Sequence, residues 1–263
     1  MTRADETDAE DDGSAMAAEF DTVAAWTADV ALDLGPEHHV PAGCRGSGGP
    51  AALRWFLQHL SPDPHATFLD VGAGVGGPAA FAAQEAGVRP VLTEPQGGAC
   101  RAARRLFDLP VLQAASPLPV SDASVFAGWC LGVLCTVADQ PQLLRELRRV
   151  LAPDARLGLL VYVAENDEVP DAPEGNHFPT SSALTDLLDG AGLAVVDSGH
   201  LAELAATPDL WQERADAVEA ELERRHGSDP RFVTAERQSG RIGRLIADGQ
   251  VRGTMLVVRP TRS

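Results

Sequence analysis

Short apolar runs alternate with amphipathic segments through the middle of the chain. The apolar runs predict strands at residues 68–71, 90–93, 111–113, 125–131, 157–163, 193–198 and 254–258. Helical spacing between them predicts helices at 77–86, 98–107, 140–151 and 182–191. Strands that alternate with helices at this spacing are typical of a parallel sheet covered by helices. The pattern therefore predicts an α/β fold with a doubly wound, mostly parallel sheet.

Further helical patterns lie outside this alternating region. The first residues are acidic, polar and without periodicity, which predicts disorder. Helices are expected at 19–31 and 51–60, with a Gly- and Pro-rich loop from 32 to 49, and again at 209–225 and 237–248. The predicted organisation is a disordered acidic tail (1–18), a helical N-terminal cap (19–66), a cofactor-binding core (67–200), a helical insertion or lid (201–250), and a final strand with the C-terminus (251–263).

A glycine-rich stretch joins the first expected strand to the first helix of the core. From Phe68 to Pro78 it reads FLDVGAGVGGP, and Glu94 ends the next strand. Glycines permit backbone conformations and a close approach to a ligand that a Cβ would prevent. A carboxylate at the end of the second strand can accept hydrogen bonds from both hydroxyls of a ribose. The arrangement predicts a site for a nucleoside-containing cofactor.

Two cofactors compete for this site. The dinucleotide fingerprint G-x-G-x-x-G is matched by three glycines, Gly72, Gly74 and Gly77. Asp70 extends the motif to D-x-G-x-G-x-G, which ends at Gly76. S-adenosylmethionine has no pyrophosphate, but its ammonium group is stabilised by a nearby carboxylate, so Asp70 favours this cofactor. A nicotinamide dehydrogenase is the alternative that this motif leaves.

The segment from Phe68 to Val163 resembles the core of class I S-adenosylmethionine-dependent methyltransferases of the small-molecule type. The matching pieces, in order, are FLDVGAGVGGP, the acid in LTEP, Leu118-Pro119, VFAGWCLGVL and LLRELRRVLAPDARLGLLVYV. The resemblance implies a seven-stranded Rossmann-like sheet whose last strand runs antiparallel between the fifth and sixth. It also implies S-adenosyl-L-methionine as the cofactor and methyl transfer to O, N or C of a small-molecule acceptor.

The resemblance also implies which residues hold the cofactor. In the core these are Asp70, Gly72, Ala73, Gly74, Gly76, Glu94, Pro95, Ala115, Ser116, Cys130 and Leu131. In the cap, Trp26 could cover the cofactor or pack in the core. Arg45 could pair with the carboxylate of the methionine part or lie in a flexible loop without a partner. Ala114 stands where the family often has an Asp for the adenine amine, so Ser116 or a backbone carbonyl is expected to replace it.

The loop after the fifth strand is expected to face the acceptor, because ligands bind outside the carboxyl ends of parallel strands. His177 is the candidate catalytic base, and Glu165 or Asn166 could orient a polar group. The alternatives for His177 are that it caps the next helix or lies in solvent. Tyr162 alternates within a buried strand and is expected in the core.

Other functions remain open because no residue is compelled to act as a base. The chain also has Phe126 where the family usually has an Asp at the start of the fourth strand. One alternative is a methyltransferase-like fold that binds S-adenosylmethionine but catalyses a non-transfer step. The other is a non-enzymatic scaffold.

The charge and composition of the chain limit the kinds of partner that we expect it to bind. The chain has 21 basic and 38 acidic residues and a formal charge of −17, which disfavours contact with nucleic-acid phosphates. No apolar run approaches the length of a membrane span, and the N-terminus lacks the features of a signal peptide. We therefore expect no membrane partner and a cytoplasmic location.

The four cysteines are expected to be reduced packing residues, because their spacing does not fit a metal site. They are Cys44, Cys100, Cys130 and Cys135. The sequence does not specify the oligomeric state.

Overall fold

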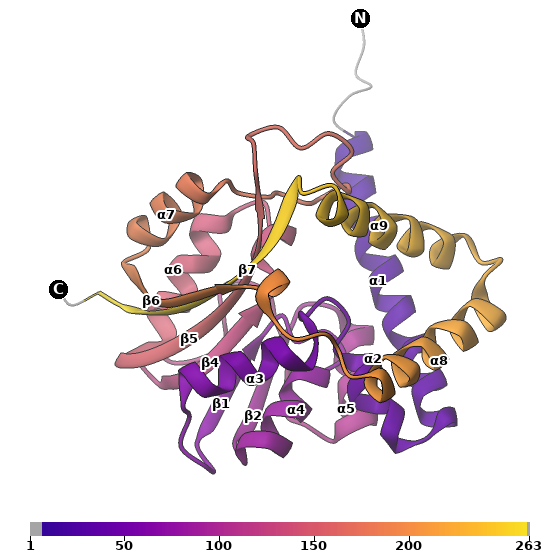
Figure 1. Cartoon of the computed structure of the whole chain (residues 1–263), viewed down its shortest axis with the longest axis horizontal. Coiled ribbons are helices and arrows are strands. Elements are labelled where there is room, and N and C mark those ends of the chain that lie inside the picture. Colours follow the sequence, from indigo (N-terminus) through magenta and orange to yellow (C-terminus); the bar gives the residue numbers. More distant parts are fainter. Residues whose placement is uncertain (1–6, 262–263) are drawn as a thin grey trace, which may run out of the picture.

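The computed structural model describes residues 7–261, with side chains from Asp21 onward, and its centre is a seven-stranded sheet (Figure 1). The strand order is β3-β2-β1-β4-β5-β7-β6. The strands are β1 (Thr67–Val71), β2 (Arg89–Glu94), β3 (Val111–Gln113), β4 (Val125–Leu131), β5 (Leu151–Ala164), β6 (Leu193–His200) and β7 (Val251–Pro260). β7 runs antiparallel between β5 and β6, and the other neighbouring pairs are parallel. The predicted fold class is confirmed.

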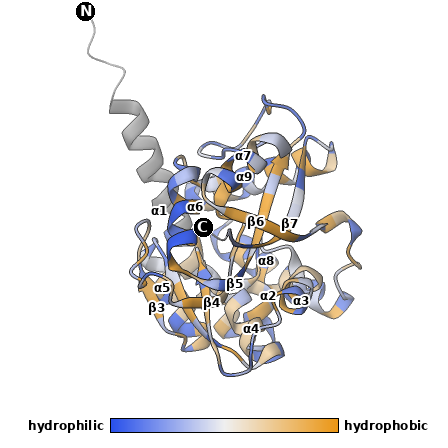
Figure 2. Cartoon of the chain, turned by 90° about the vertical axis from the view of Figure 1, so that its left-hand side faces the viewer, coloured by the Kyte–Doolittle hydropathy of each residue, from blue (hydrophilic) through white to orange (hydrophobic). Residues whose placement is uncertain are grey.

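Helices cover both faces of the sheet (Figure 1). One face carries α3 (Gly49–Leu60), α4 (Gly77–Ala86) and α5 (Gly97–Phe107), and the other carries α6 (Gln140–Val150) and α7 (Ser181–Gly190). Each face has its own apolar core: Phe56 packs with Trp129 on the first, and Leu147 packs with Leu157 on the second. Figure 2 shows this as apolar residues along β6 and β7 and hydrophilic residues on the outer side of α6.

A side-chain cap marks the start of α6, the helix that leads directly into β5. The Asp139 carboxylate accepts a hydrogen bond from Gln142 N at 2.9 Å, so it caps α6 as its sequence position predicts. β5 begins at Leu151, directly after α6, rather than at residue 157. Leu151 pairs with Val125, and the register shifts before Ala127. The strand therefore includes residues 152–156, which the sequence pattern left between a helix and a strand, and Ala152 and Ala155 are buried in it.

The N-terminal cap begins earlier than expected. α1 (Thr7–Leu34) starts at Thr7 rather than at residue 19, so the prediction of disorder is wrong for residues 7–18, while residues 1–6 lie outside the described part. Alanine favours a helix, and acidic residues are stabilised near a helix N-terminus. The expected loop up to residue 49 contains η1 (Pro36–His38) and α2 (His39–Gly43), because the residues of α2 pack against α4.

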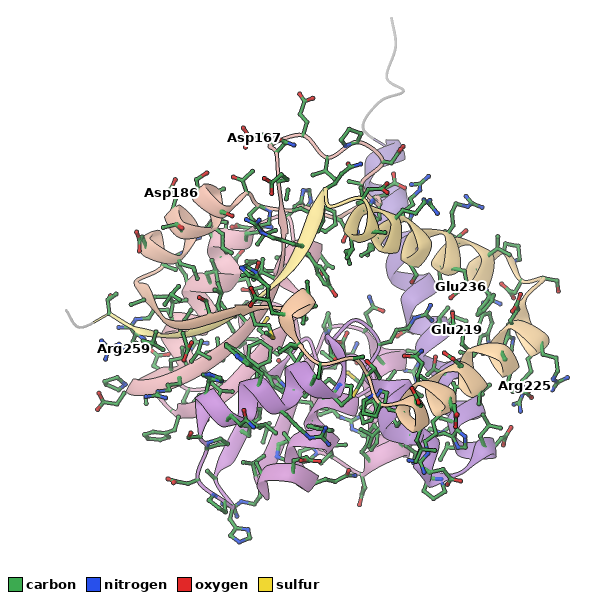
Figure 3. All side chains as sticks on the ribbon, viewed as in Figure 1. Asp167, Asp186, Glu219, Arg225, Glu236 and Arg259 are labelled. Atoms are coloured by element: carbon green, nitrogen blue, oxygen red, sulfur yellow. The ribbon has the colours of Figure 1, made fainter. Side chains whose placement is uncertain are left out.

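The insertion before β7 is a pair of helices that lies beside α1 (Figure 1). After η3 (Leu201–Glu203), α8 (Asp209–His226) runs into α9 (Pro230–Ala247). α9 begins seven residues earlier than expected, because the Asp229 carboxylate accepts from Arg231 N at 2.9 Å and proline suits the first helical turn. Arg225 at the end of α8, labelled in Figure 3, bonds Asp33 of α1 at 2.7 Å. The insertion and the cap therefore form one helical layer.

The four cysteines are buried and free, as expected of packing residues. No helix among the described residues combines the length and the apolar character that a membrane crossing requires.

Candidate functional site

The turn between β1 and α4 has the backbone that its glycines predict. The φ angles of Gly72, Gly74 and Gly76 are 69°, 53° and 86°, in the left-handed region that favours glycine. A Cβ at Gly72 would lie 2.3 Å from Val133 Cγ2, so this glycine is required by packing. A Cβ at Gly74 would meet nothing within 4 Å. Gly74 therefore leaves open space where a ligand can approach the backbone.

Glu94 lies at the end of β2 and faces this turn. Its carboxylate accepts from Gly74 N at 2.9 Å and from Gln96 N at 3.0 Å. Burial raises the pKa of the Glu94 carboxyl, and the two backbone hydrogen bonds oppose the rise. Each carboxylate oxygen has more than one acceptor site, so Glu94 can still bind ribose hydroxyls while it holds the turn.

Asp70 lies at the end of β1, in register with Trp129 on β4, so both side chains leave the same face of the sheet. Asp70 is 2 % exposed, and neither its Oδ2 atom nor Trp129 Nε1 has a hydrogen-bond partner in the described residues. Burial raises the pKa of Asp70 to about 7, with the indole of Trp129 opposing the rise and the charge of Glu94 adding to it. An unpaired buried carboxylate oxygen beside the glycine turn is the feature that a bound ammonium group would satisfy.

Asp21 of α1 adds a third carboxylate, which sequence reasoning missed. It accepts a hydrogen bond from Gly98 N at the start of α5 and lies 3.6 Å from Arg101 Nη2. Its charge raises the pKa of Glu94, so the two acids are neighbours. The sequence predicts the helix that carries Asp21, but nothing in the pattern indicates which strand end that helix approaches.

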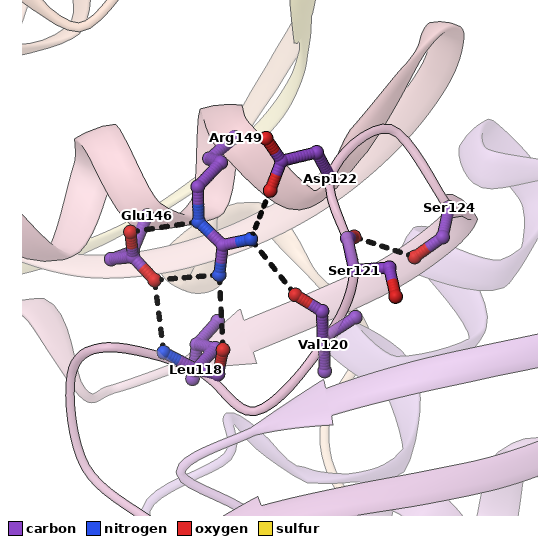
Figure 4. A network of polar contacts seen from close by, with 7 residues as sticks. All are labelled: Leu118, Val120, Ser121, Asp122, Ser124, Glu146 and Arg149. Atoms are coloured by element: carbon purple, nitrogen blue, oxygen red, sulfur yellow. Dashed lines mark hydrogen bonds and ion pairs between the residues drawn. The ribbon is translucent and has the colours of Figure 1, made fainter.

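The loop after β3 lies beside Glu94. Ala114 N donates to the backbone oxygen of Glu94 at 3.0 Å, and Ala115 and Ser116 are exposed. Arg149 of α6 supports the following residues: it bonds Asp122 at 2.6 Å and two backbone carbonyls of the loop (Figure 4). The adenine role of Ser116 or of a backbone carbonyl stays a prediction.

The loop between α2 and α3, residues 43–49, reaches the same edge of the sheet. A Cβ at Gly43 would lie 2.7 Å from Gly77 Cα at the start of α4, so the two backbones are in direct contact. At the middle of the loop, the oxygen of Gly46 lies 3.2 Å from the position of a Cβ on Gly132, which follows β4. The loop therefore joins the glycine turn to the end of β4.

Arg45 on this loop is paired with the insertion. Its Nη2 atom lies 2.6 Å from Glu236 Oε1 and 3.4 Å from Ser239 Oγ, both on α9. The alternative of a loop arginine without a partner is therefore wrong. The predicted contact with a cofactor carboxylate stays a prediction.

Trp26 packs against the turn of the insertion. Its ring stacks on His226 with centroids 4.0 Å apart and planes 5° apart, and the Arg231 guanidinium lies 5.0 Å from its centroid. These contacts support the packing alternative, and the predicted cover over the cofactor remains untested.

His177 lies on the α6–α7 side of the sheet. Its backbone N donates to Cys135 O at 2.7 Å, and its backbone oxygen accepts from Gln140 Nε2 at 2.7 Å. The exposed side chain lines a hollow of about 340 Å³ with Asp167, which Figure 3 labels on the loop after β5. Thr180, not His177, caps α7, so the capping alternative is wrong. The role of His177 as a base stays a prediction.

The two polar residues expected to accompany His177 are both exposed. Glu165 lies 3.4 Å from Arg252 of β7, and Asn166 follows it on the same loop. No hydrogen bond of the described residues joins either side chain to the glycine turn.

Tyr162 is the second residue that sequence reasoning missed. It is half-buried rather than enclosed in the core, and its Cε2 atom lies 3.9 Å from the position of a Cβ on Gly132. The Cys135 thiol lies 3.3 Å from both the backbone N and the backbone oxygen of Tyr162, so it fixes this residue where β4 has ended. The period-two pattern of β5 places its side chain on one face, but only the early end of β4 opens space beside it.

Comparison with known proteins identifies the core. A sequence model described as a methyltransferase domain matches residues 69–159, which include the glycine turn, Glu94 and most of β5. Residues 69–159 are therefore similar in sequence to a methyltransferase domain. This match and the fold confirm the resemblance to class I S-adenosylmethionine-dependent methyltransferases. A search of curated protein sequences found no match.

Several solved structures are similar in fold to most of this chain. The cyclopropane synthase MmaA2 of Mycobacterium tuberculosis is 17 % identical, with a TM-score of 0.65 and coverage of 80 % of this chain and 83 % of that one. The cyclase SpnF is 19 % identical, with a TM-score of 0.63 and 80 % coverage of each chain. A phosphoethanolamine N-methyltransferase of Haemonchus contortus, in complex with S-adenosylhomocysteine, is 15 % identical with a TM-score of 0.62; the alignment covers 80 % of this chain and 52 % of that one. At these identities the comparison shows the fold alone.

Proposed function

We propose that this chain binds S-adenosyl-L-methionine and transfers its methyl group to O, N or C of a small-molecule acceptor. One arrangement carries the proposal: the carboxylates of Asp70 and Glu94, at the ends of adjacent strands, flank a glycine turn that is open at Gly74. The same residues complete the D-x-G-x-G-x-G motif within the matched methyltransferase domain.

The residues of the site fit this cofactor. Asp70 has an unpaired buried oxygen for the ammonium group of the methionine part, and Glu94 has free acceptor sites for the ribose hydroxyls. Arg45 is the basic side chain of the loop that touches the glycine turn, and it would bind the methionine carboxylate by leaving Glu236. The buried carboxyl of Asp70 beside the glycine turn disfavours a pyrophosphate there, which argues against a dinucleotide.

When bound, the cofactor supplies a methyl group on a positively charged sulfur. The protein then has to align the acceptor with that carbon and exclude water. Loop 43–49 and the helical layer of α1, α8 and α9 are suited to covering the site, because the loop touches the start of α4 and α1 packs against α5. His177 is our candidate base for an acceptor that must lose a proton.

The charge of the chain fits methylation of a small molecule, for which we propose the cytoplasm as the location. A net charge of −17 disfavours nucleic acid as the acceptor. We therefore expect no nucleic-acid partner, and the absence of a long apolar helix among the described residues is the reason we expect no membrane partner.

The test is a screen of small-molecule acceptors with methyl-labelled S-adenosylmethionine, in which both the labelled product and S-adenosylhomocysteine are measured. Formation of both in equal amounts supports transfer. Cofactor binding with conversion of a substrate but no S-adenosylhomocysteine would favour a non-transfer step, and no cofactor binding would favour a scaffold.

A further inference from the structure

Three segments that are far apart in the sequence meet at Gly132 and Val133, directly after β4. The glycine turn contacts Val133 at Gly72, because Val133 Cγ2 occupies the space where a Cβ of Gly72 would lie. Loop 43–49 contacts Gly132 through the backbone oxygen of Gly46, and β5 contacts it through the ring of Tyr162. Tyr162 lies beside Gly132, and the next residue, Val133, contacts Gly72. Tyr162 is therefore close to the glycine turn that the proposed function assigns to the cofactor.

The backbone of Tyr162 is fixed by hydrogen bonds, but its hydroxyl has no hydrogen-bond partner among the described residues. Gly132 has no side chain that would cover the ring on one side, and the space over Gly253, the register partner of Tyr162 on β7, is filled by the side chain of Leu201. The Cys135 thiol bonds both backbone groups of Tyr162. Among the described residues, the phenol oxygen has no hydrogen-bond partner, and it is not among the fully buried polar atoms. Burial raises the pKa of Tyr162, so the group stays a neutral phenol that can donate its proton.

The charges around this position disfavour an anionic ligand. Asp70 and Glu94 flank the glycine turn, and Asp21 lies close enough to Glu94 to raise its pKa. Arg45 is the basic residue of loop 43–49, and it is engaged either by Glu236 or, in the proposed function, by the methionine carboxylate. A carboxylate or phosphate on the acceptor would therefore lose hydration without gaining a cation. A cationic acceptor would face the positively charged sulfur of the cofactor.

We propose that Tyr162 binds the acceptor, and that the acceptor is an uncharged molecule whose hydroxyl, carbonyl or amine group hydrogen-bonds the Tyr162 phenol. The inference rests on the proposed function, because the cofactor defines the place next to which the acceptor lies. Tyr162 is a binding residue in this account, and it determines which acceptors are accepted.

The chain offers a direct readout because Tyr162 is its single tyrosine. Labelling tyrosine with carbon-13 at Cζ gives one NMR signal, which is followed in the presence of saturating S-adenosylhomocysteine. Two probes of matched shape are titrated: cyclohexanol and cyclohexanecarboxylate. We expect a saturable shift of the signal with cyclohexanol and a response at least fivefold weaker with cyclohexanecarboxylate.

The conservative variant Tyr162→Phe keeps the ring and removes the hydroxyl. Saturation-transfer NMR of cyclohexanol should show binding threefold to tenfold weaker in this variant, the range expected for one neutral hydrogen bond. The melting temperature and the affinity for S-adenosylhomocysteine should not change. A variant that loses cyclohexanol affinity only together with its melting temperature would assign Tyr162 a structural role and overturn the inference.

The outcomes separate the two proposals. If calorimetry shows no binding of S-adenosylhomocysteine to the unchanged protein, the proposed function fails and this inference fails with it. If S-adenosylhomocysteine binds but no probe shifts the Tyr162 signal, or cyclohexanecarboxylate binds most tightly, this inference alone is overturned.

Discussion

Replacing Asp70 by Asn should change how the stability of the protein depends on pH. Asp70 is 2 % exposed, one of its oxygens is unpaired, and burial raises its pKa to about 7 from 3.8. In the unfolded chain the carboxyl ionises first, so the folded state loses stability as the pH rises from about 4 to about 7. At about 1.4 kcal/mol per pKa unit, the full cost is about 4 kcal/mol and is constant above the folded pKa.

The Asp70→Asn variant cannot ionise at this position and should not show the loss. The difference in free energy of unfolding between variant and unchanged protein should therefore grow by about 2.5 kcal/mol between pH 5 and pH 8, in favour of the variant. This difference isolates the ionisation, because any cost of the Asn amide facing the indole of Trp129 is the same at each pH.

The assay is urea unfolding of both proteins, followed by circular dichroism at pH 5, 6, 7 and 8. The matched control is Asp63→Asn, at an exposed aspartate near the start of β1, which should leave the pH dependence unchanged. Parallel stability curves for Asp70→Asn and the unchanged protein would refute the reasoning, because they would mean that the carboxyl ionises equally well in both states.

Three other substitutions test separate parts of the account. Glu94→Gln should weaken the binding of S-adenosylhomocysteine by about 1–3 kcal/mol in calorimetry, because a charge-assisted acceptor is lost; unchanged affinity would remove Glu94 from the site. Gly77→Ala should destabilise the protein by about 1–3 kcal/mol in urea unfolding, because its Cβ would lie 2.2 Å from the carbonyl carbon of Gly43, whereas Gly190→Ala, in open space, should be tolerated. His177→Ala should lower the turnover of an identified acceptor without changing affinity for S-adenosylhomocysteine, and full turnover would show that His177 is not the base.

The sheet could be predicted from the sequence because its signals are local. Each strand is an apolar run, and the strand from 125 to 131 has the predicted bounds. The glycine turn and Glu94 lie within one strand–helix–strand unit, so their meeting follows from the connection itself. The start of α9 at Pro230 also has a local signal in the sequence, namely Asp229 as the cap and proline in the first turn. The predicted start at residue 237 does not use this signal.

The rest of the site depends on contacts between distant segments. Asp21 reaches α5 only because α1 packs against that helix, and Arg45 meets Glu236 only because the insertion folds back over the cap. Tyr162 follows the alternation of a core strand, and its exposure is decided by where β4 ends. A hydrophobic pattern specifies which face of an element is buried, but not which neighbour buries it.

The central claim is tested most directly by calorimetric titration of the purified protein, in separate experiments, with S-adenosylmethionine, S-adenosylhomocysteine and NAD. The account predicts micromolar binding of the first two and no binding of NAD. Binding of NAD alone would contradict the role given to Asp70. Binding of none of the three would contradict the site itself.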